Sequence, residues 1–97
     1  MSREEVLNDA QRAYLTKMRE TMQFSQTVMA RQLGMSLRAY SDIETGVSKC
    51  RRIHILAAER VLMREAVLRH EFDRLTSTLR HDLKPLLSLL PKGPEGA

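Results

Sequence analysis

The sequence predicts an all-α fold. Only four glycines and three prolines occur in the 97 residues, and two of each fall among the last seven. The chain before Pro85 therefore holds almost nothing that would break a helix. Its apolar side chains recur at spacings of three and four residues, the period of an amphipathic helix. Because a chain this short feeds a single hydrophobic core, we expect one compact body, with or without an appended helix.

The charge balance is mildly basic and suits a polyanionic partner. Sixteen basic and twelve acidic residues give a net charge of +4. The excess lies mainly in residues 1–60, with ten basic and seven acidic side chains, so a nucleic acid, if one binds, is expected to bind there. The single Cys50 cannot form an intramolecular disulfide, and neither a signal peptide nor a membrane-spanning apolar run is present. We expect a cytoplasmic protein without membrane contact.

The first expected helix ends near Met22. Asn8 or Asp9 is its expected N-cap, since a short polar side chain can accept a hydrogen bond from a free backbone N–H. The residues expected on its buried face are Ala10, Tyr14, Leu15, Met18 and Met22.

The next two expected helices are short and flank a tight turn. Ser25 and Ser36 stand where N-caps are needed, while Gly34 and Gly46 stand where the two helices end. Ala30 lies where the helices would cross, and a larger side chain would push them apart. The expected shared interior consists of Met29, Leu33, Met35, Tyr40 and Ile43. This spacing predicts a near-perpendicular helix pair over residues 26–45.

The segment from Ser48 to Leu83 contains neither glycine nor proline, so we expect one long helix there. A heptad stripe runs along it at Val61, Leu68, Phe72, Leu75, Leu79 and Leu86. A helix this long cannot bury such a stripe on so small a body. We expect it to pair with a second copy of the chain, and folding back on its own domain is the alternative. Residues 91–97 lack apolar side chains, and we expect them to be disordered.

Residues 25–36 follow the pattern Ser-Gln-x-x-hydrophobic-Ala-x-x-hydrophobic-Gly-hydrophobic-Ser, and Ile43-Glu44-Thr45-Gly46 follows at a fixed distance. Both halves resemble the Xre/Cro-type, phage-repressor-like family of helix-turn-helix transcriptional regulators, over about residues 15–56. The resemblance implies a lambda-repressor-like DNA-binding domain over residues 9–60. A C-terminal dimerisation helix over residues 61–90 and the tail 91–97 would complete the chain.

The resemblance also implies roles for three polar residues near the start of this domain. Arg19 is expected to pair with Glu44, and Gln26 to contact a phosphate and support the recognition helix. Gln23 departs from the family, which often has Gly or Asn there, so we expect a strained turn after the first helix.

The helix over residues 36–46 is expected to enter the major groove of DNA. Its outward side chains, facing the bases, would be Ser36, Leu37, Arg38, Ser41, Asp42 and Thr45. Arg38 can donate two hydrogen bonds to guanine, Leu37 can contact a thymine methyl, and Asp42 can accept from cytosine or orient Arg38. Three basic side chains after Gly46 are expected to contact phosphates of the DNA backbone. The alternative is that they belong to a solvated loop without a ligand. They are Lys49, Arg51 and Arg52.

These expectations describe a bacterial or phage repressor that binds double-stranded DNA as a homodimer. Its two recognition helices would lie about 34–36 Å apart and read a palindromic operator. One alternative is an antitoxin-like interaction protein, whose C-terminal helix binds a second protein and whose helix-turn-helix autoregulates its operon. Another is a structural use of the fold without DNA.

An enzyme is not expected, because no nucleophile with a base, paired carboxylates or phosphate-cradling glycine loop stands out. No cofactor is expected. No metal is expected either, because His54, His70 and His81 show no ligand spacing with Cys50 or with one another.

Overall fold

The computed structural model describes residues 2–90, so the disorder expected for residues 91–97 lies outside the described part. Within it the chain forms five α-helices and one 3-10 helix, and no strand, which confirms the all-α prediction. The elements are α1 (Arg3–Thr21), α2 (Gln26–Leu33), α3 (Leu37–Thr45), α4 (Arg52–Leu68), η1 (Phe72–Arg74) and α5 (Ser77–Ser88).

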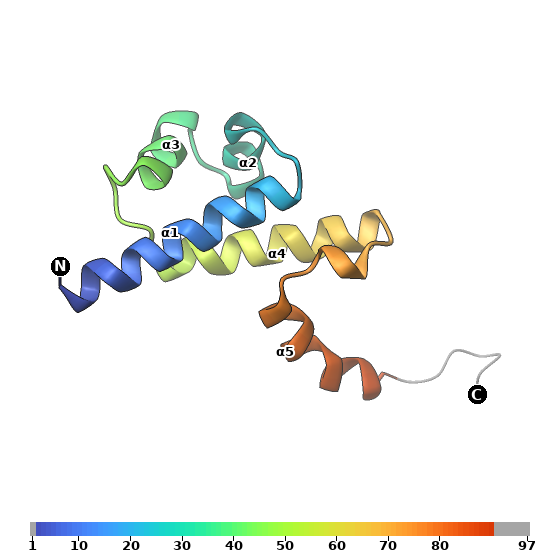
Figure 1. Ribbon diagram of the computed structural model, residues 1–97. Helices are drawn as coiled ribbons and strands as arrows, with labels where there is room; N and C mark the ends of the chain where they lie inside the picture. Colours follow the sequence, from blue (N-terminus) through green and yellow to red (C-terminus); the bar gives the residue numbers. More distant parts are fainter. Residues whose placement is uncertain (1, 91–97) are drawn as a thin grey trace.

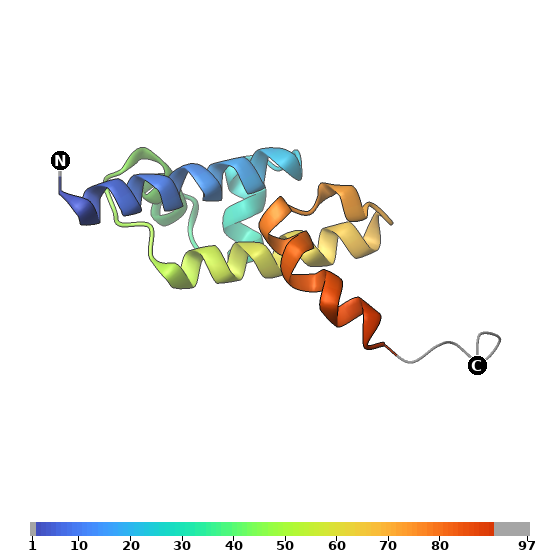
Figure 2. The ribbon, with the colours of Figure 1, turned by 60° about the horizontal axis from the view of Figure 1, so that its bottom comes forward.

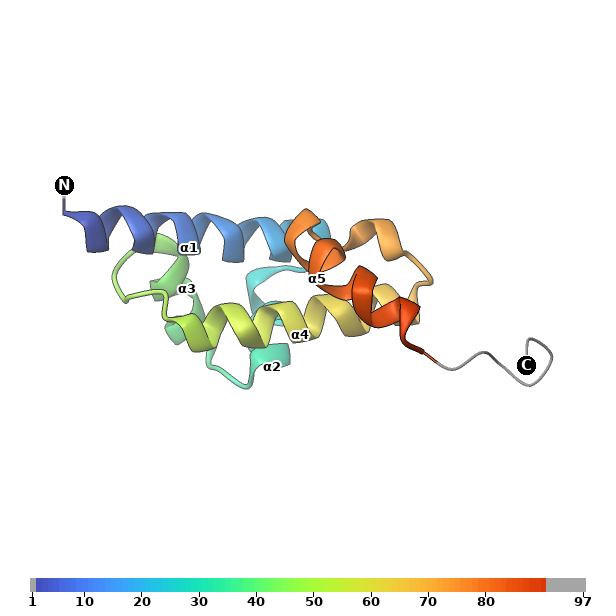
Figure 3. The ribbon, with the colours of Figure 1, turned by 90° about the horizontal axis from the view of Figure 1, so that it is seen from below.

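Helices α1 and α4 lie side by side and run in the same direction, and together they form the middle of the molecule (Figure 1). The short helices α2 and α3 cover one side of this pair, and α5 lies on the opposite side (Figure 3). The C-terminal end of α5 points away from the body (Figure 2). The pair α2–α3 and the helix α5 are therefore presented on opposite sides of the molecule.

One continuous apolar core joins these layers. Its buried members are Leu15, Met18, Met22, Met29, Ala30, Tyr40, Ile43, Cys50, Ala58, Leu62, Ala66, Leu75 and Leu79. Leu33 and Met35 are partly buried against it, so the expected interior of the α2–α3 pair is confirmed. Ala10 is exposed, contrary to prediction, because the buried face of α1 begins further along the helix.

The ends of α2 and α3 are as predicted. The Oγ atoms of Ser25 and Ser36 each accept a hydrogen bond of 3.1 Å from the backbone N–H three residues on. Gly34 and Gly46 adopt left-handed conformations, with φ of 73° and 91°. Gln23 is left-handed as well, at φ 59°, so the strained turn expected before α2 is present.

The predicted N-cap of α1 was wrong. The helix begins at Arg3, and Ser2 is its cap, because Ser2 Oγ accepts from the backbone N–H of Glu5 at 3.1 Å. Glu4 and Glu5 also favour a helix start here, since negative charge is stabilised in a first turn. Asn8 lies inside the helix, and its side chain has another role, described below.

The single long helix predicted from Ser48 was also wrong. Residues 48–51 are not helical, and α4 ends at Leu68. His70 takes a left-handed conformation at φ 54°, and the chain turns back toward α1. There Arg69 Nη2 donates to Met22 O at 3.3 Å and Arg74 Nη1 donates to Thr21 O at 2.8 Å. These hydrogen bonds give partners to backbone carbonyl oxygens at the end of α1. A helix that continued past Leu68 would carry the arginines away from α1, and these bonds would be lost.

The predicted heptad stripe therefore does not lie along one helix. Leu75 and Leu79 belong to the chain's own core, with exposed fractions of 6% and 7%, and Val61 packs against it. Leu68, Phe72 and Leu86 remain exposed but lie on α4, η1 and α5 respectively. The predicted boundary between residues 60 and 61 falls inside α4. Folding back on the same domain, the alternative considered for this segment, is what residues 69–79 do.

Candidate nucleic-acid interface

The rotation of α3 is fixed by the carboxylate of Glu44. Arg19 donates to it twice, from Nε at 2.7 Å and from Nη2 at 3.1 Å, so the pair expected from the family resemblance is present. Gln26 Nε2 donates to the same carboxylate at 2.9 Å, and the Tyr40 hydroxyl donates to it as well. One acidic side chain thus connects α1, α2 and α3.

This network also sets the protonation of its members. Burial alone would raise the pKa of Glu44, but the hydrogen bonds from Arg19, Tyr40 and Gln26 outweigh it and hold this pKa below its ordinary value. Burial, followed by the bond to Glu44, raises the pKa of Tyr40. At neutral pH Glu44 is therefore charged and Tyr40 is neutral. Both point inward, so the opposite face of α3 is turned to solvent.

The outward face of α3 carries the side chains expected to face DNA bases. Arg38 is 90% exposed, and its Nε lies 3.8 Å from Asp42 Oδ2, one helical turn away. Leu37 and Thr45 are exposed, and Ser41 is half-buried. The hydroxyl of Ser36 is occupied as a helix cap.

A hollow of about 580 Å³ separates α3 from the beginning of α4. It brings together Ser36, Arg38 and Asp42 from the α3 side with Lys49 and Arg51 from the other side. The three cations are exposed. An anionic ligand lying across the hollow would therefore meet positive charge from both walls.

The remaining predicted site residues lie outside this hollow. Leu37, Ser41 and Thr45 lie further round α3 or at its end, and Arg52 is the exposed first residue of α4. Gln26 is half-buried and donates to Glu44, so its described contact is the support of α3.

Sequence reasoning gave no role to His54, which lines the hollow. Its Nδ1 accepts a hydrogen bond of 2.9 Å from the Arg51 backbone N–H, and this fixes the start of α4. Burial, and then the charge of Arg51, lower the pKa of His54, so the imidazole is neutral at pH 7. No sequence signal distinguishes this histidine from a surface one.

Comparison of the chain with protein-family models, curated proteins and solved structures finds no match. In residues 2–90, no helix combines the length and apolar character needed to cross a membrane. Nor does the described part bring three or more His, Cys, Asp or Glu side chains together in a group that could hold a metal ion.

Proposed function

We propose that the chain is a sequence-specific DNA-binding transcriptional regulator with a lambda-repressor-like helix-turn-helix formed by α2 and α3. The observation that carries this proposal is the placement of Arg38, Lys49 and Arg51 around one hollow beside the outward face of α3. A helix fits the major groove, and the cations beside it, Lys49 and Arg51, suit the phosphates along the adjacent edge of the groove. The protein acts in the cytoplasm of a bacterium or an infected host, most simply as a repressor that occupies a promoter.

Each part of the interface has a separate task. Arg38 reads guanine. Its guanidinium is exposed to solvent and has only the long contact to Asp42, so it can donate two hydrogen bonds to a base. Lys49, Arg51 and Arg52 bind phosphates and set the salt dependence of affinity. Gln26 and Glu44 hold α3 at the angle at which it meets DNA.

The experiment is a selection of bound duplexes from a random pool at a stated salt concentration, followed by titrations with variants. Arg38→Ala should cost about 1–3 kcal/mol and relax the preference at one base position. Arg51→Ala should weaken binding to all sequences and reduce the salt slope by about 1. Arg64→Ala, which removes an exposed arginine of α4, is the matched control and should change neither quantity. Unchanged affinity and preference in Arg38→Ala would contradict base reading by α3 and favour a structural use of the fold.

The regulator is proposed to act as a homodimer. Its contact would use apolar side chains that stay exposed at the C-terminal side, namely Leu68, Phe72, Leu86, Leu87 and Leu90. To read an inverted repeat, such a two-fold pair must present its two α3 helices on one face, about 34–36 Å apart.

The exposed leucines at the end of α5 also favour a second candidate, an antitoxin-like protein that binds another protein there. Leu89 is 78% exposed and Leu90 is 58% exposed, and with Leu86 and Leu87 they form a run of exposed apolar side chains of the kind that marks protein-binding surfaces. The mass of the purified chain separates the two candidates. A monomer that becomes heteromeric with the product of a neighbouring gene supports this candidate, and a homodimer alone supports the first.

A further inference from the structure

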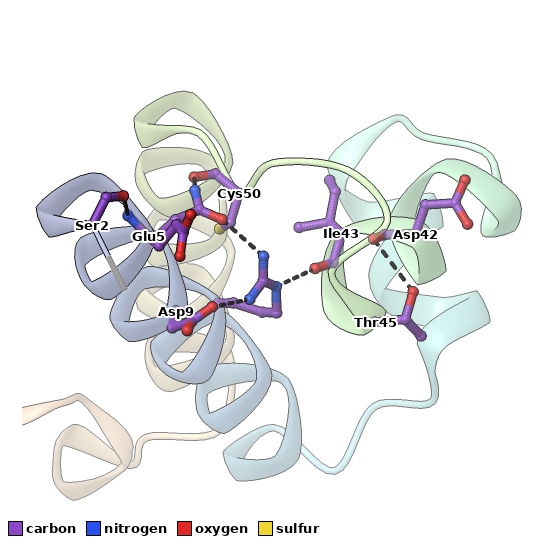
Figure 4. Close-up of polar contacts among 9 residues, drawn as sticks. Ser2, Glu5, Asp9, Asp42, Ile43, Thr45 and Cys50 are labelled. Atoms are coloured by element: carbon purple, nitrogen blue, oxygen red, sulfur yellow. Dashed lines mark hydrogen bonds and ion pairs between the residues drawn. The ribbon is translucent and has the colours of Figure 1, made fainter.

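The N-terminal half of α1 holds both ends of residues 43–50, which comprise the last residues of α3 and the chain that leads toward α4 (the α3–α4 segment). Arg12 Nε donates to Ile43 O at 2.9 Å, and Asn8 Nδ2 donates to Cys50 O at 2.8 Å. The two side chains are themselves joined, because Arg12 Nη2 donates to Asn8 Oδ1 at 2.8 Å. Figure 4 shows Cys50 above this part of α1 and Ile43 to its right, at the end of α3. One turn of α1 therefore fixes the whole segment.

Arg12 is enclosed and does not offer a free charge to DNA. Its side chain is 20% exposed, and Nη1 lies 2.5 Å from Asp9 Oδ1. Gly46 lies beside the guanidinium, where a Cβ atom would be in ordinary van der Waals contact with Arg12 Cζ, at 3.5 Å. The cation instead faces a carbonyl at the C-terminal end of α3, where the helix dipole favours positive charge.

We propose that Asn8 and Arg12 are positioning residues for DNA binding, an inference that rests on the proposed function. They hold the α3–α4 segment closed, and this segment carries Thr45 and Lys49 and leads directly into Arg51. Ser48 N also donates to Asp42 O at 2.9 Å, but this bond joins the segment to α3 and not to α1. A loop ordered before binding avoids the entropy cost of ordering it on the ligand.

Cys50 gives a direct measure of this closure. It is the only cysteine, it is the last residue of the segment, and it is 1% exposed, so a chromogenic disulfide reagent reaches its thiol only when the segment opens. Arg12→Ala and Asn8→Asp are the test variants. Asn8→Asp keeps an acceptor for Arg12 but loses the donor to Cys50 O. Both should react about 10- to 100-fold faster than wild type.

The matched control is Gln11→Ala, since Gln11 lines the same side of α1 without taking part in these bonds. It should react at the wild-type rate. Unfolding free energies measured in parallel separate local opening from global unfolding. The proposal is overturned if the thiol of Cys50 reacts no faster in the test variants than in wild type. It is also overturned if the faster reaction is fully explained by a lower free energy of global unfolding.

The same variants are then titrated with the selected DNA. Arg12→Ala and Asn8→Asp should bind about tenfold more weakly, whereas Arg38→Ala should lose affinity without any change in thiol reactivity. If the Cys50 thiol of these variants is labelled faster but their DNA affinity is unchanged, the positioning role is overturned while the proposed function stands. If the wild-type chain binds no duplex in the selection, the proposed function fails, and the positioning role fails with it.

Discussion

Glu44 joins three helices through one carboxylate, and its side chain is only 6% exposed. E44Q keeps the size of the side chain but removes the charge that Arg19 faces. Because the guanidinium of Arg19 would then be a partly buried charge without a charged partner, we expect E44Q to lower the free energy of unfolding by about 3 kcal/mol. Chemical denaturation at neutral pH measures this loss. Glu20→Gln, at an exposed position of α1, is the control and should stay within about 0.5 kcal/mol of wild type.

The lowered pKa of Glu44 gives its contribution a pH window. A carboxyl whose pKa is lower in the folded than in the unfolded protein stabilises the fold fully above its ordinary pKa, here 4.5. The contribution is lost as the pH falls through the lower pKa of the folded state. The difference in unfolding free energy between wild type and E44Q should therefore narrow well below pH 4.5. A difference that stays constant into strong acid would show that Glu44 is not the titrating group.

Gly34 is required for its backbone conformation and not for space. A Cβ atom there would meet nothing within 4 Å, yet its φ of 73° strains any L side chain. We expect Gly34→Ala to cost about 1–2 kcal/mol of stability from this conformation alone. Gly34→Asn should cost less, because asparagine tolerates the left-handed region better. Equal losses for the two variants would indicate a steric cause instead.

At the scale of elements, the local signals were the ones that could be predicted. The bounds of α2 and α3 could be predicted from Ser25, Ser36, Gly34 and Gly46. The serines cap the helix starts and the glycines adopt the left-handed conformation at the helix ends, so each effect involves backbone only a few residues away. The end of α4 could not be found in this way. It depends on contacts of Arg69 and Arg74 with α1, which are 47 and 53 residues away in the sequence. His70 then adopts a left-handed conformation, which is uncommon for a residue other than glycine although histidine tolerates it better than most.

Helix α5 is attached to the body through a chain of hydroxyl groups. The Tyr14 hydroxyl donates to Glu59 Oε2 at 2.9 Å and lies 2.9 Å from Thr76 Oγ1, which also caps α5. Tyr14→Phe should cost about 1–3 kcal/mol, because Glu59 and Thr76 lose a partner. Amide hydrogen exchange should quicken in α5 more than in α2.

Ser77→Ala removes an exposed hydroxyl from the first residue of α5 and serves as the control for this change. It should leave the exchange of α5 amides unchanged. Uniform acceleration over all helices in Tyr14→Phe would show that the tyrosine supports the core as a whole and not α5 in particular.

At the scale of the whole molecule, the sequence predicted the outward face of α3 but not what holds it. Arg38 and Asp42 could be placed outward because Tyr40 and Ile43 had to face the core. Asn8 and Arg12 share one face of α1, a spacing visible in the sequence. Their partners are backbone carbonyls 42 and 31 residues away, which carry no sequence signal.

Leu79 and Leu86 both lie on α5, but only Leu86 is exposed. Substitutions at the two positions are therefore expected to affect stability and oligomeric state differently. Leu79 is buried within one chain, so Leu79→Ala should lower stability by about 2–5 kcal/mol. Leu86 is 53% exposed, so in the proposed homodimer Leu86→Lys should keep the helix content and shift the mass in sedimentation equilibrium from dimer to monomer. It should then bind a full inverted repeat more weakly but an isolated half-site as well as wild type does.

Val6→Lys is the matched control, because Val6 is exposed to a similar extent, 51%, and belongs to the first turns of α1, whose N-terminal end lies away from α5 (Figure 1). It should remain dimeric. A wild-type chain that stays monomeric at concentrations that saturate the inverted repeat would remove the dimer from the mechanism. In that case α3 would have to recognise its site from a single copy, with only the contacts of one hollow and its flanking cations to supply specificity.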